Sequence, residues 1–452
     1  MAAFRSISKG SLLRGIKLDN LIKNSSELEN IDSNTPLPYF GVGPFLLFLL
    51  AALLSYCFAN PFFGIISQIT HYNIKYLYLI SRDGPLIIIV STVHAYLFLR
   101  YSLKDIKWFL YYFFLIPFVF FGLLIGFRHH GTSALSSFRL LIVSFFVLMA
   151  SYLLSKQTKQ DIQVISYHFV MKLYVIIVTM YAIMLMLEAA EFHIAHFSFP
   201  GNEVINNFYR DIFSYQGISI PANNYSGLIG RRFSTIYFEP VGLSLFMVPP
   251  FLYILSKKIT TSSICFLLLI LGGIFFSASS LAFLFVVTLI FARFLEFIGR
   301  RSYIFFIFIG VLLNLTLLLL NSSGHTIMSS GGHLSALFEG VKTVFLKHYY
   351  FGMGIGSGGL WGISSDNSSI GAGDSYLGLS LKEVGFFTFG IYFLFIALLR
   401  KNINKSSSTL KYLSNILFLM ILLSTPYSGA AFVGDSFQIF YLLYFISDIN
   451  AC

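Results

Sequence analysis

SSICFLLLILGGIFFSASSLAFLFVVTLIFARFLEFI, residues 262–298, contains two apolar runs joined by a short turn of small residues. A helix needs about 17 to 25 mostly apolar residues to cross the hydrocarbon core of a bilayer. The whole chain repeats this pattern, because 56% of its 452 residues are hydrophobic, 18% are aromatic and only 11% are charged. Such a composition excludes an ordinary soluble protein. The sequence therefore predicts an all-α polytopic membrane protein with about 12 transmembrane helices. The predicted spans are residues 39–59, 85–101, 108–126, 139–155, 167–190, 239–255, 262–278, 280–298, 302–321, 383–399, 411–425 and 431–448.

The basic residues predict the orientation of these spans. Lysine and arginine accumulate in short cytoplasmic loops. With the N-terminus inside, 19 of the 30 basic residues lie on the inner side, 10 lie outside and Lys172 falls within a span. Both termini are therefore expected in the cytoplasm. The same bias accounts for the formal net charge of +11 without a nucleic-acid partner.

Two long external loops organise the chain. Residues 1–38 predict a polar cytoplasmic tail, and residues 39–450 predict a single transmembrane domain with outer loops at 191–238 and 322–382. Functional residues concentrate in loops that a rigid scaffold holds. The chemistry is therefore expected on the outer face. The three cysteines are too few and too scattered for a disulfide framework or a metal site.

Arg231 and Arg232 begin RRFSTIYFEPVGLSLFMVPP, residues 231–250, where the first long loop meets a span. A guanidinium is costly to bury at the mouth of a membrane helix, whereas its planar donor fork matches phosphate oxygens. A lipid pyrophosphate suits this pair. The alternatives are an anchor at the membrane interface and an ion pair with Glu239.

Arg128 and Arg139 flank the short external segment RHHGTSALSSFR. The predicted topology places this second pair of cations at the same depth as the first. Together the two pairs could clamp two phosphates. The alternative for Arg128 and Arg139 is a purely structural role, because short loops often carry interface charges.

Transfer of a group from a pyrophosphate to a hydroxyl calls for a general base near the outer membrane surface. Asp374 is the first candidate because it begins an apolar helix after a glycine-rich hinge, and its alternative role is the N-cap of that helix. Glu239 is the second candidate, with stabilisation of a helix start as its alternative. His333 and Tyr376 complete the predicted substrate-binding residues, and for His333 the alternative is an ordinary surface position in the loop.

Three motifs carry a resemblance to a known superfamily. RRFSTIYFEPVGLS resembles the Arg-x-x-x-x-x-x-Glu-Pro region of bacterial O-antigen and exopolysaccharide polymerases. GMGIGSGG and then GAGDSYLGLSLKEVGFFTFGIYFLF, residues 371–395, are similar to the Gly-x-Gly, Asn-or-Asp-x-Tyr-Leu and Glu-x-Gly pattern that closes the second long loop in the polymerase and ligase superfamily. The small polar turn in FSASSLAFLF resembles that superfamily's turn between two spans. The resemblance covers roughly residues 120–400 and includes the order of the elements.

This resemblance implies a GT-C-like integral membrane glycosyltransferase of the bacterial inner membrane, with its active site facing the periplasm. Its donor and acceptor would be oligosaccharides linked to undecaprenyl pyrophosphate, without a metal or other cofactor. The implied partners are the bilayer and a chain-length regulator. Ligases of the superfamily usually carry His-Asn where this chain has Gly373-Asp374, which favours a polymerase. The alternatives are an O-antigen ligase, a transporter or flippase of lipid-linked sugars, and a non-enzymatic scaffold.

Overall fold

The structure is a computed structural model of the whole chain, and all the residues that it describes belong to one compact unit, Val42–Cys452. The described residues are 46, 49–54, 87–88, 90–95, 120–129, 133–157, 160–190, 226–227, 230–231, 240–277, 279–298, 301–322, 330–357, 375–404, 408–426, 428 and 437–446.

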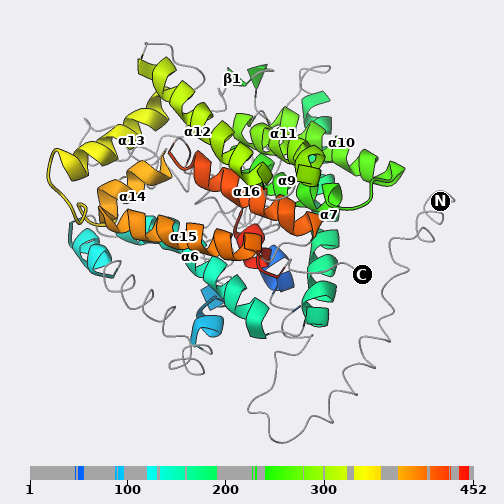
Figure 1. Cartoon of the computed structure of the whole chain (residues 1–452), viewed down its shortest axis with the longest axis horizontal. Helices are drawn as coiled ribbons and strands as arrows, with labels where there is room; N and C mark the ends of the chain where they lie inside the picture. Colours follow the sequence, from blue (N-terminus) through cyan, green and yellow to red (C-terminus); the bar gives the residue numbers. More distant parts are fainter. Residues whose placement is uncertain are drawn as a thin grey trace, which may run out of the picture. The chain divides into compact units, whose positions relative to one another are not determined.

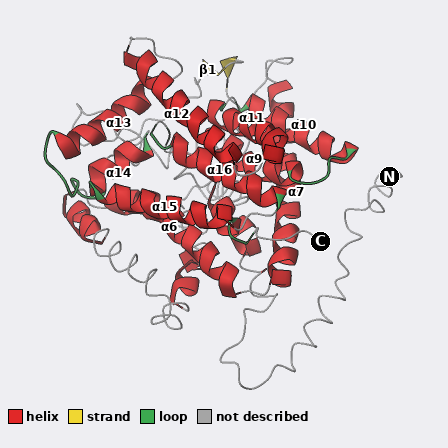
Figure 2. Ribbon diagram, viewed as in Figure 1, coloured by secondary structure: helices red, strands yellow, loops and turns green. Residues whose placement is uncertain are grey.

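The described residues form an all-α fold, as the sequence predicts (Figure 2). The longer elements are α6 (Ser133–Gln157), α7 (Gln160–Ala190), α9 (Pro240–Leu255), α10 (Thr261–Phe276), α11 (Ser280–Leu295), α12 (Arg301–Ser322), α13 (Ser330–Phe345), α15 (Phe387–Asn404) and α16 (Thr409–Ser424) (Figure 1). The shorter ones are α14 (Tyr376–Val384), α18 (Gln438–Leu443) and the 3-10 turn η3 (Glu296–Ile298). A further helix, labelled neither here nor in the figure, covers residues 120–129. Two strands of two residues each, β1 (Ser226–Gly227) and β2 (Gly230–Arg231), pair antiparallel.

One described helix is long and apolar enough to cross a membrane by its length and composition. It is the segment Asp161–Leu187 of α7, which has 27 residues and a mean hydropathy of 2.2. α9, α10, α11 and α16 are apolar but have 16 residues each. At 1.5 Å per residue such a helix is about 24 Å long, less than the roughly 30 Å of a hydrocarbon core. The predicted number of spans therefore stays a prediction.

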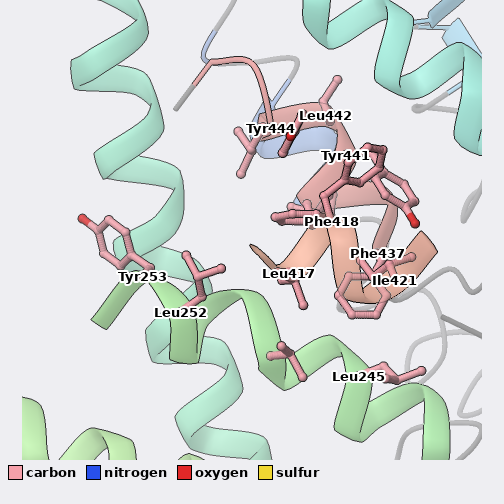
Figure 3. Packing of buried hydrophobic residues seen from close by; sticks show 14 of the residues in the cluster. Leu245, Leu252, Tyr253, Leu417, Phe418, Ile421, Phe437, Tyr441, Leu442 and Tyr444 are labelled. Atoms are coloured by element: carbon pink, nitrogen blue, oxygen red, sulfur yellow. The ribbon is translucent and has the colours of Figure 1, made fainter. Parts of the chain in front are cut away.

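The centre of the fold is an aromatic and aliphatic core between α9, α16 and α18 (Figure 3). The ring centroids of Phe418 and Tyr444 lie 4.8 Å apart. α7 packs against α9, where the hydroxyl of Tyr174 donates a hydrogen bond of 2.7 Å to the carbonyl of Phe246. Gly273 lets α10 approach α7 closely, because a Cβ there would lie 2.9 Å from the Cβ of Ala182.

Polar contacts join the ends of helices that run in alternating directions. The amide of Asn402, near the end of α15, donates to the side-chain oxygen of Asn415 in α16 at 2.9 Å. The hydroxyl of Tyr444, after α18, donates to the same oxygen at 2.6 Å. The hydroxyl of Tyr412 donates to Ser302, near the start of α12, at 2.7 Å. The start of α12, the ends of α15 and α18 and the first half of α16 therefore share one polar layer.

The end of α16 lies in the opposite layer. The carbonyl of Thr425, directly after α16, accepts a 3.2 Å hydrogen bond from the amide of Leu377 in α14. α14 therefore begins beside the end of α16 that is remote from Asn415. Most of α14 belongs to the predicted outer loop at 322–382, and the predicted alternation of helix directions stays a prediction.

The predicted outer loop at 322–382 contains two helices, α13 and the greater part of α14. The predicted span at 383–399 starts too early, because α14 ends at Val384 and α15 begins at Phe387. Gly385 separates them with φ of +60°, a conformation that favours glycine. A Cβ on Gly385 would also meet the carbonyl oxygen of Tyr350 at 2.1 Å. Hydropathy alone does not reveal the break at Gly385, because apolar residues lie on both sides of it.

Candidate functional site

The predicted site residues fall into three groups by their place in the structure. Asp374, Glu239 and Arg232 lie outside the described residues. Arg231 belongs to β2, His333 to α13 and Arg139 to α6, and only their backbones are described. Arg128 and Tyr376 are described with their side chains. The predictions for Asp374, Glu239, Arg232, Arg231, His333 and Arg139 therefore stay predictions.

The glycine-rich motif of the sequence analysis forms a tight loop, residues 352–357, here called the glycine loop. Gly352, Gly354 and Gly356 have φ of +80°, +93° and +101°, which a residue with a Cβ rarely adopts. The amide of Met353 donates to the carbonyl of Lys382 at 2.8 Å, and the amide of Gly354 donates to the carbonyl of Glu383 at 3.2 Å. The loop is therefore bound along the last turn of α14.

The other side of the glycine loop contacts the helix at 120–129. The amide of Ile355 donates to the carbonyl of Gly122 at 3.0 Å. A Cβ on Gly126 would lie only 1.8 Å from the carbonyl oxygen of Ile355, so the two backbones touch. Arg128 lies two residues later at the end of the same helix and is exposed. The loop thereby fixes the helix that carries Arg128 relative to α14.

The start of α14 is fixed by Ser375. Its hydroxyl accepts a 3.0 Å hydrogen bond from the amide of Gly378, which makes Ser375 the N-cap of the helix. The N-cap position, weighed in the sequence analysis as the alternative role of Asp374, is therefore occupied by its neighbour. Tyr376 is fully buried, and its ring centroid lies 6.2 Å from that of Tyr392. Because it has no exposed surface, stacking on a sugar would require this packing to open.

α13 and α14 cross at two glycines. A Cβ on Gly340 would meet the carbonyl oxygen of Gly378 at 2.3 Å, and a Cβ on Gly378 would meet the carbonyl oxygen of Ala336 at 2.4 Å. Helices approach this closely only where no side chain stands between their backbones. The crossing therefore fixes the first turn of α14 against α13.

Glu383 and Lys382 are functional candidates that the sequence analysis did not single out. The carboxylate of the fully buried Glu383 accepts a 2.8 Å hydrogen bond from the amide of Gly356. Burial lowers the pKa of Lys382, a shift that the carboxylates of Glu339 and Glu383 oppose and that Lys347 reinforces. Lys347 in turn pairs with Glu339 at 3.0 Å. The Glu-x-Gly motif, Glu383 to Gly385, is the sequence feature that could have pointed to Glu383.

The glycine loop joins α14 to the helix at 120–129 and does not offer its backbone amides to an anion. The six amides from Gly352 to Ser357 each donate to an oxygen of the protein. An anion near this loop must therefore be held by side chains. In the described part of the chain, no group of three or more His, Cys, Asp and Glu residues has the proximity that a metal ion requires.

Comparisons with protein-family models, with curated proteins and with solved structures each found no match.

Proposed function

We propose that the chain is an integral membrane glycosyltransferase of the O-antigen polymerase type. The reaction joins oligosaccharide repeat units carried on undecaprenyl pyrophosphate. A hydroxyl of the incoming lipid-linked repeat attacks C1 of the growing glycan and forms the new glycosidic bond. The bond from C1 to the pyrophosphate oxygen breaks with its electron pair, and undecaprenyl pyrophosphate leaves. Asp374, or Glu239 as the second candidate, accepts the proton of the attacking hydroxyl.

The observation that carries this proposal is the junction of three motifs that are distant in sequence. The glycine loop is hydrogen-bonded to Gly122 on one side and to Glu383 on the other. Gly122 lies in the helix at 120–129, which also carries Arg128. Glu383 lies in α14, which begins two residues after Asp374. A phosphate-binding arginine and a base that belong to one site need such a common support, since catalytic groups must be held in fixed geometry.

Positive charge is expected to supply most of the catalysis. Negative charge develops on the pyrophosphate as its bond to C1 breaks, and preorganised cations at that position are usually the largest single catalytic contribution. Arg232 is the main candidate, with Arg231, Arg128 and Arg139 as companions and His333 on the glycan side. No metal or other cofactor takes part in the proposed reaction.

The composition and the apolar helices support a location in a membrane. The resemblance favours the bacterial inner membrane, with the site on the periplasmic side. The 19 to 10 division of basic residues supports cytoplasmic termini. The alternation of polar layers along α12, α15 and α16 agrees with this arrangement. The proposed partners are the bilayer, the lipid-linked oligosaccharide and a chain-length regulator.

The experiment that tests this function uses the purified protein in proteoliposomes with undecaprenyl-pyrophosphate-linked repeat units. We expect a ladder of longer glycans and release of undecaprenyl pyrophosphate. Arg232→Ala should abolish the ladder, and Arg232→Lys should fail as well because a point charge cannot replace the bidentate donor fork. Gly390→Ala, at an exposed position of α15 with open space around it, is the matched control and should polymerise normally.

The same question can be asked in cells by profiling lipopolysaccharide from a deletion strain. A single repeat unit on the lipid core is the outcome expected for loss of a polymerase. Complete absence of repeat units would point to the ligase alternative or to an earlier step. An unchanged ladder would contradict the proposal.

A further inference from the structure

The region that follows α13 exposes an unusual amount of aromatic surface. Phe345, Leu346, Tyr349, Tyr350, Phe351 and Phe386 form what we call the aromatic patch. Phe351 is 73% exposed and Leu346 is 70% exposed. Large contiguous apolar surfaces of this kind mark sites of interaction with a membrane or a partner.

Several residues of the aromatic patch contact one another through ring stacking and a backbone hydrogen bond. The rings of Tyr350 and Phe386 stack with their centroids 5.7 Å apart and their planes within 8°. The amide of Phe386 donates to the carbonyl of Tyr350 at 2.9 Å. The ring of Phe351 stacks on Phe387 at 5.8 Å. These contacts join Tyr350 and Phe351 to Phe386 and Phe387 at the start of α15.

α13 has one face buried against the protein and an opposite face that is exposed. Ala336, Gly340 and Val344, spaced by four residues, are buried against the rest of the protein. Phe338, 54% exposed, and Lys342 lie on the opposite face of α13, which leads into the patch. A helix with aromatic and basic residues on its outer face is typical of elements that lie in the plane of a membrane interface. The hydroxyl of Tyr350, bonded to His348 at 2.9 Å, adds the polar tip common in interfacial aromatic residues.

The patch continues into a stripe along α15. Phe386, Phe389, Phe393 and Ile396 follow at intervals of three and four residues, and each is at least 41% exposed. Residues with this spacing share one face of a helix. Because α15 covers most of the predicted span at 383–399, this face is the one that would contact lipid. The aromatic patch lies at the outer end of that stripe.

On the basis of the proposed function, which puts α15 in the membrane, we infer that the aromatic patch and the outer face of α13 lie in the headgroup region of the periplasmic leaflet. The occupant of this surface is the phospholipid bilayer. The continuity with the stripe on α15 favours lipid over a protein partner, which would have to replace lipid along the helix as well. Through the glycine crossing of Gly340 and Gly378, α13 then holds α14 at a fixed depth below the bilayer surface.

Nitroxide labelling of the full chain in proteoliposomes of phosphatidylethanolamine and phosphatidylglycerol tests this inference. In a background without Cys57, Cys265 and Cys452, the label is attached after Leu346→Cys or Phe351→Cys. Collisions with oxygen, which partitions into lipid, are compared with collisions with a water-soluble nickel complex. Phe393→Cys serves as the reference for the hydrocarbon core and Lys258→Cys, exposed between α9 and α10, as the reference for water.

We expect oxygen collisions to dominate at positions 346 and 351, with a depth shallower than that of position 393. Nickel collisions should dominate at position 258. Nickel-dominated labels at 346 and 351 beside an oxygen-dominated 393 would overturn the inference and leave the membrane location of the enzyme intact. Labels at 346 and 351 that meet neither reagent would also overturn it, because protein would then cover the patch. A nickel-dominated label at 393 would instead reject the span itself and with it the proposed membrane enzyme.

Discussion

Gly126→Ala is the sharpest test of the contact that joins the helix at 120–129 to the glycine loop. A Cβ at this position would lie 1.8 Å from the carbonyl oxygen of Ile355, 2.7 Å from its carbonyl carbon and 2.8 Å from its nitrogen. Non-bonded atoms prefer about 3.5 Å, so the two elements would have to separate by roughly 1.5 Å. All three neighbouring atoms belong to the backbone, and no side-chain rotation can relieve the clash.

The energetic cost follows from the contacts that this separation removes. The hydrogen bond from the amide of Ile355 to the carbonyl of Gly122 is 3.0 Å long and would be lost. Its loss costs about 1 kcal/mol, and forced overpacking costs about 1–3 kcal/mol. We therefore expect Gly126→Ala to destabilise the folded protein by about 2–4 kcal/mol. The helix that carries Arg128 would also move away from α14, so glycan polymerisation should fall with it.

The assay compares thermal unfolding and polymerisation of the wild type, Gly126→Ala and Gly390→Ala in the same lipid nanodiscs. Gly390 is exposed in α15, and a Cβ there would meet nothing within 4 Å. Its replacement by alanine should be neutral or stabilise the helix by up to about 1 kcal/mol. Equal melting temperatures and equal activity for the two variants would refute the contact. The shared support of Arg128 and α14 would then have to be abandoned.

Three further predictions concern other parts of the chain. If Asp374 is the base, Asp374→Asn should insert normally and polymerise at least about 10²-fold more slowly. Ser375→Ala, which removes the N-cap of α14, should lose about 1 kcal/mol of stability and keep its activity. Normal activity of Asp374→Asn would show that Asp374 is not the base. Glu383→Gln should stay close to wild type in thermal unfolding, because the new side-chain oxygen can accept the hydrogen bond from the amide of Gly356. Glu383→Ala should lose about 1–3 kcal/mol, because the buried amide of Gly356 would have no acceptor. Equal melting temperatures for the two variants would contradict this prediction. Burial, reinforced by Lys172, lowers the pKa of Lys257 from 10.5 to about 8. Between about pH 8 and pH 10.5 the folded state therefore binds fewer protons than the unfolded state, so the free energy of unfolding should rise with pH in this range. The rise should vanish in Lys257→Met.

The helices could be predicted from the sequence wherever an apolar run decides the structure. α10 differs from its predicted span by one residue at the start and two at the end, and α11 begins as predicted and ends three residues earlier, because long apolar runs leave little choice. A helix after Asp374 was predicted, and α14 begins two residues later, but its end at Val384 could not be found in this way, since its nine residues include the buried polar side chains of Ser380, Lys382 and Glu383. It is held by the backbone contact between Gly340 and Gly378, which hydropathy does not report.

The motifs of the candidate site were visible in the sequence, but their mutual contacts were not. Gly-x-Gly and Glu-x-Gly were identified as separate elements of one pattern. The hydrogen bond from the amide of Gly356 to the carboxylate of Glu383 spans 27 positions, and nothing local specifies it. Likewise, Arg128 was identified by its place at a predicted membrane surface, whereas its support by Gly126 depends on a contact with Ile355, more than two hundred positions later.

The hydrogen bonds of the glycine loop also decide how a pyrophosphate could be bound. Glycine-rich loops often bind phosphate through free backbone amides. Here the amides from Gly352 to Ser357 are all used within the protein, and the side chain of Glu383 occupies one of them. A phosphate bound directly to this loop would have to break those bonds and approach a buried carboxylate. The loop therefore acts as a clamp, and the recognition of a lipid pyrophosphate rests on arginine side chains, which makes Arg232 and Arg128 the decisive residues of the proposed function.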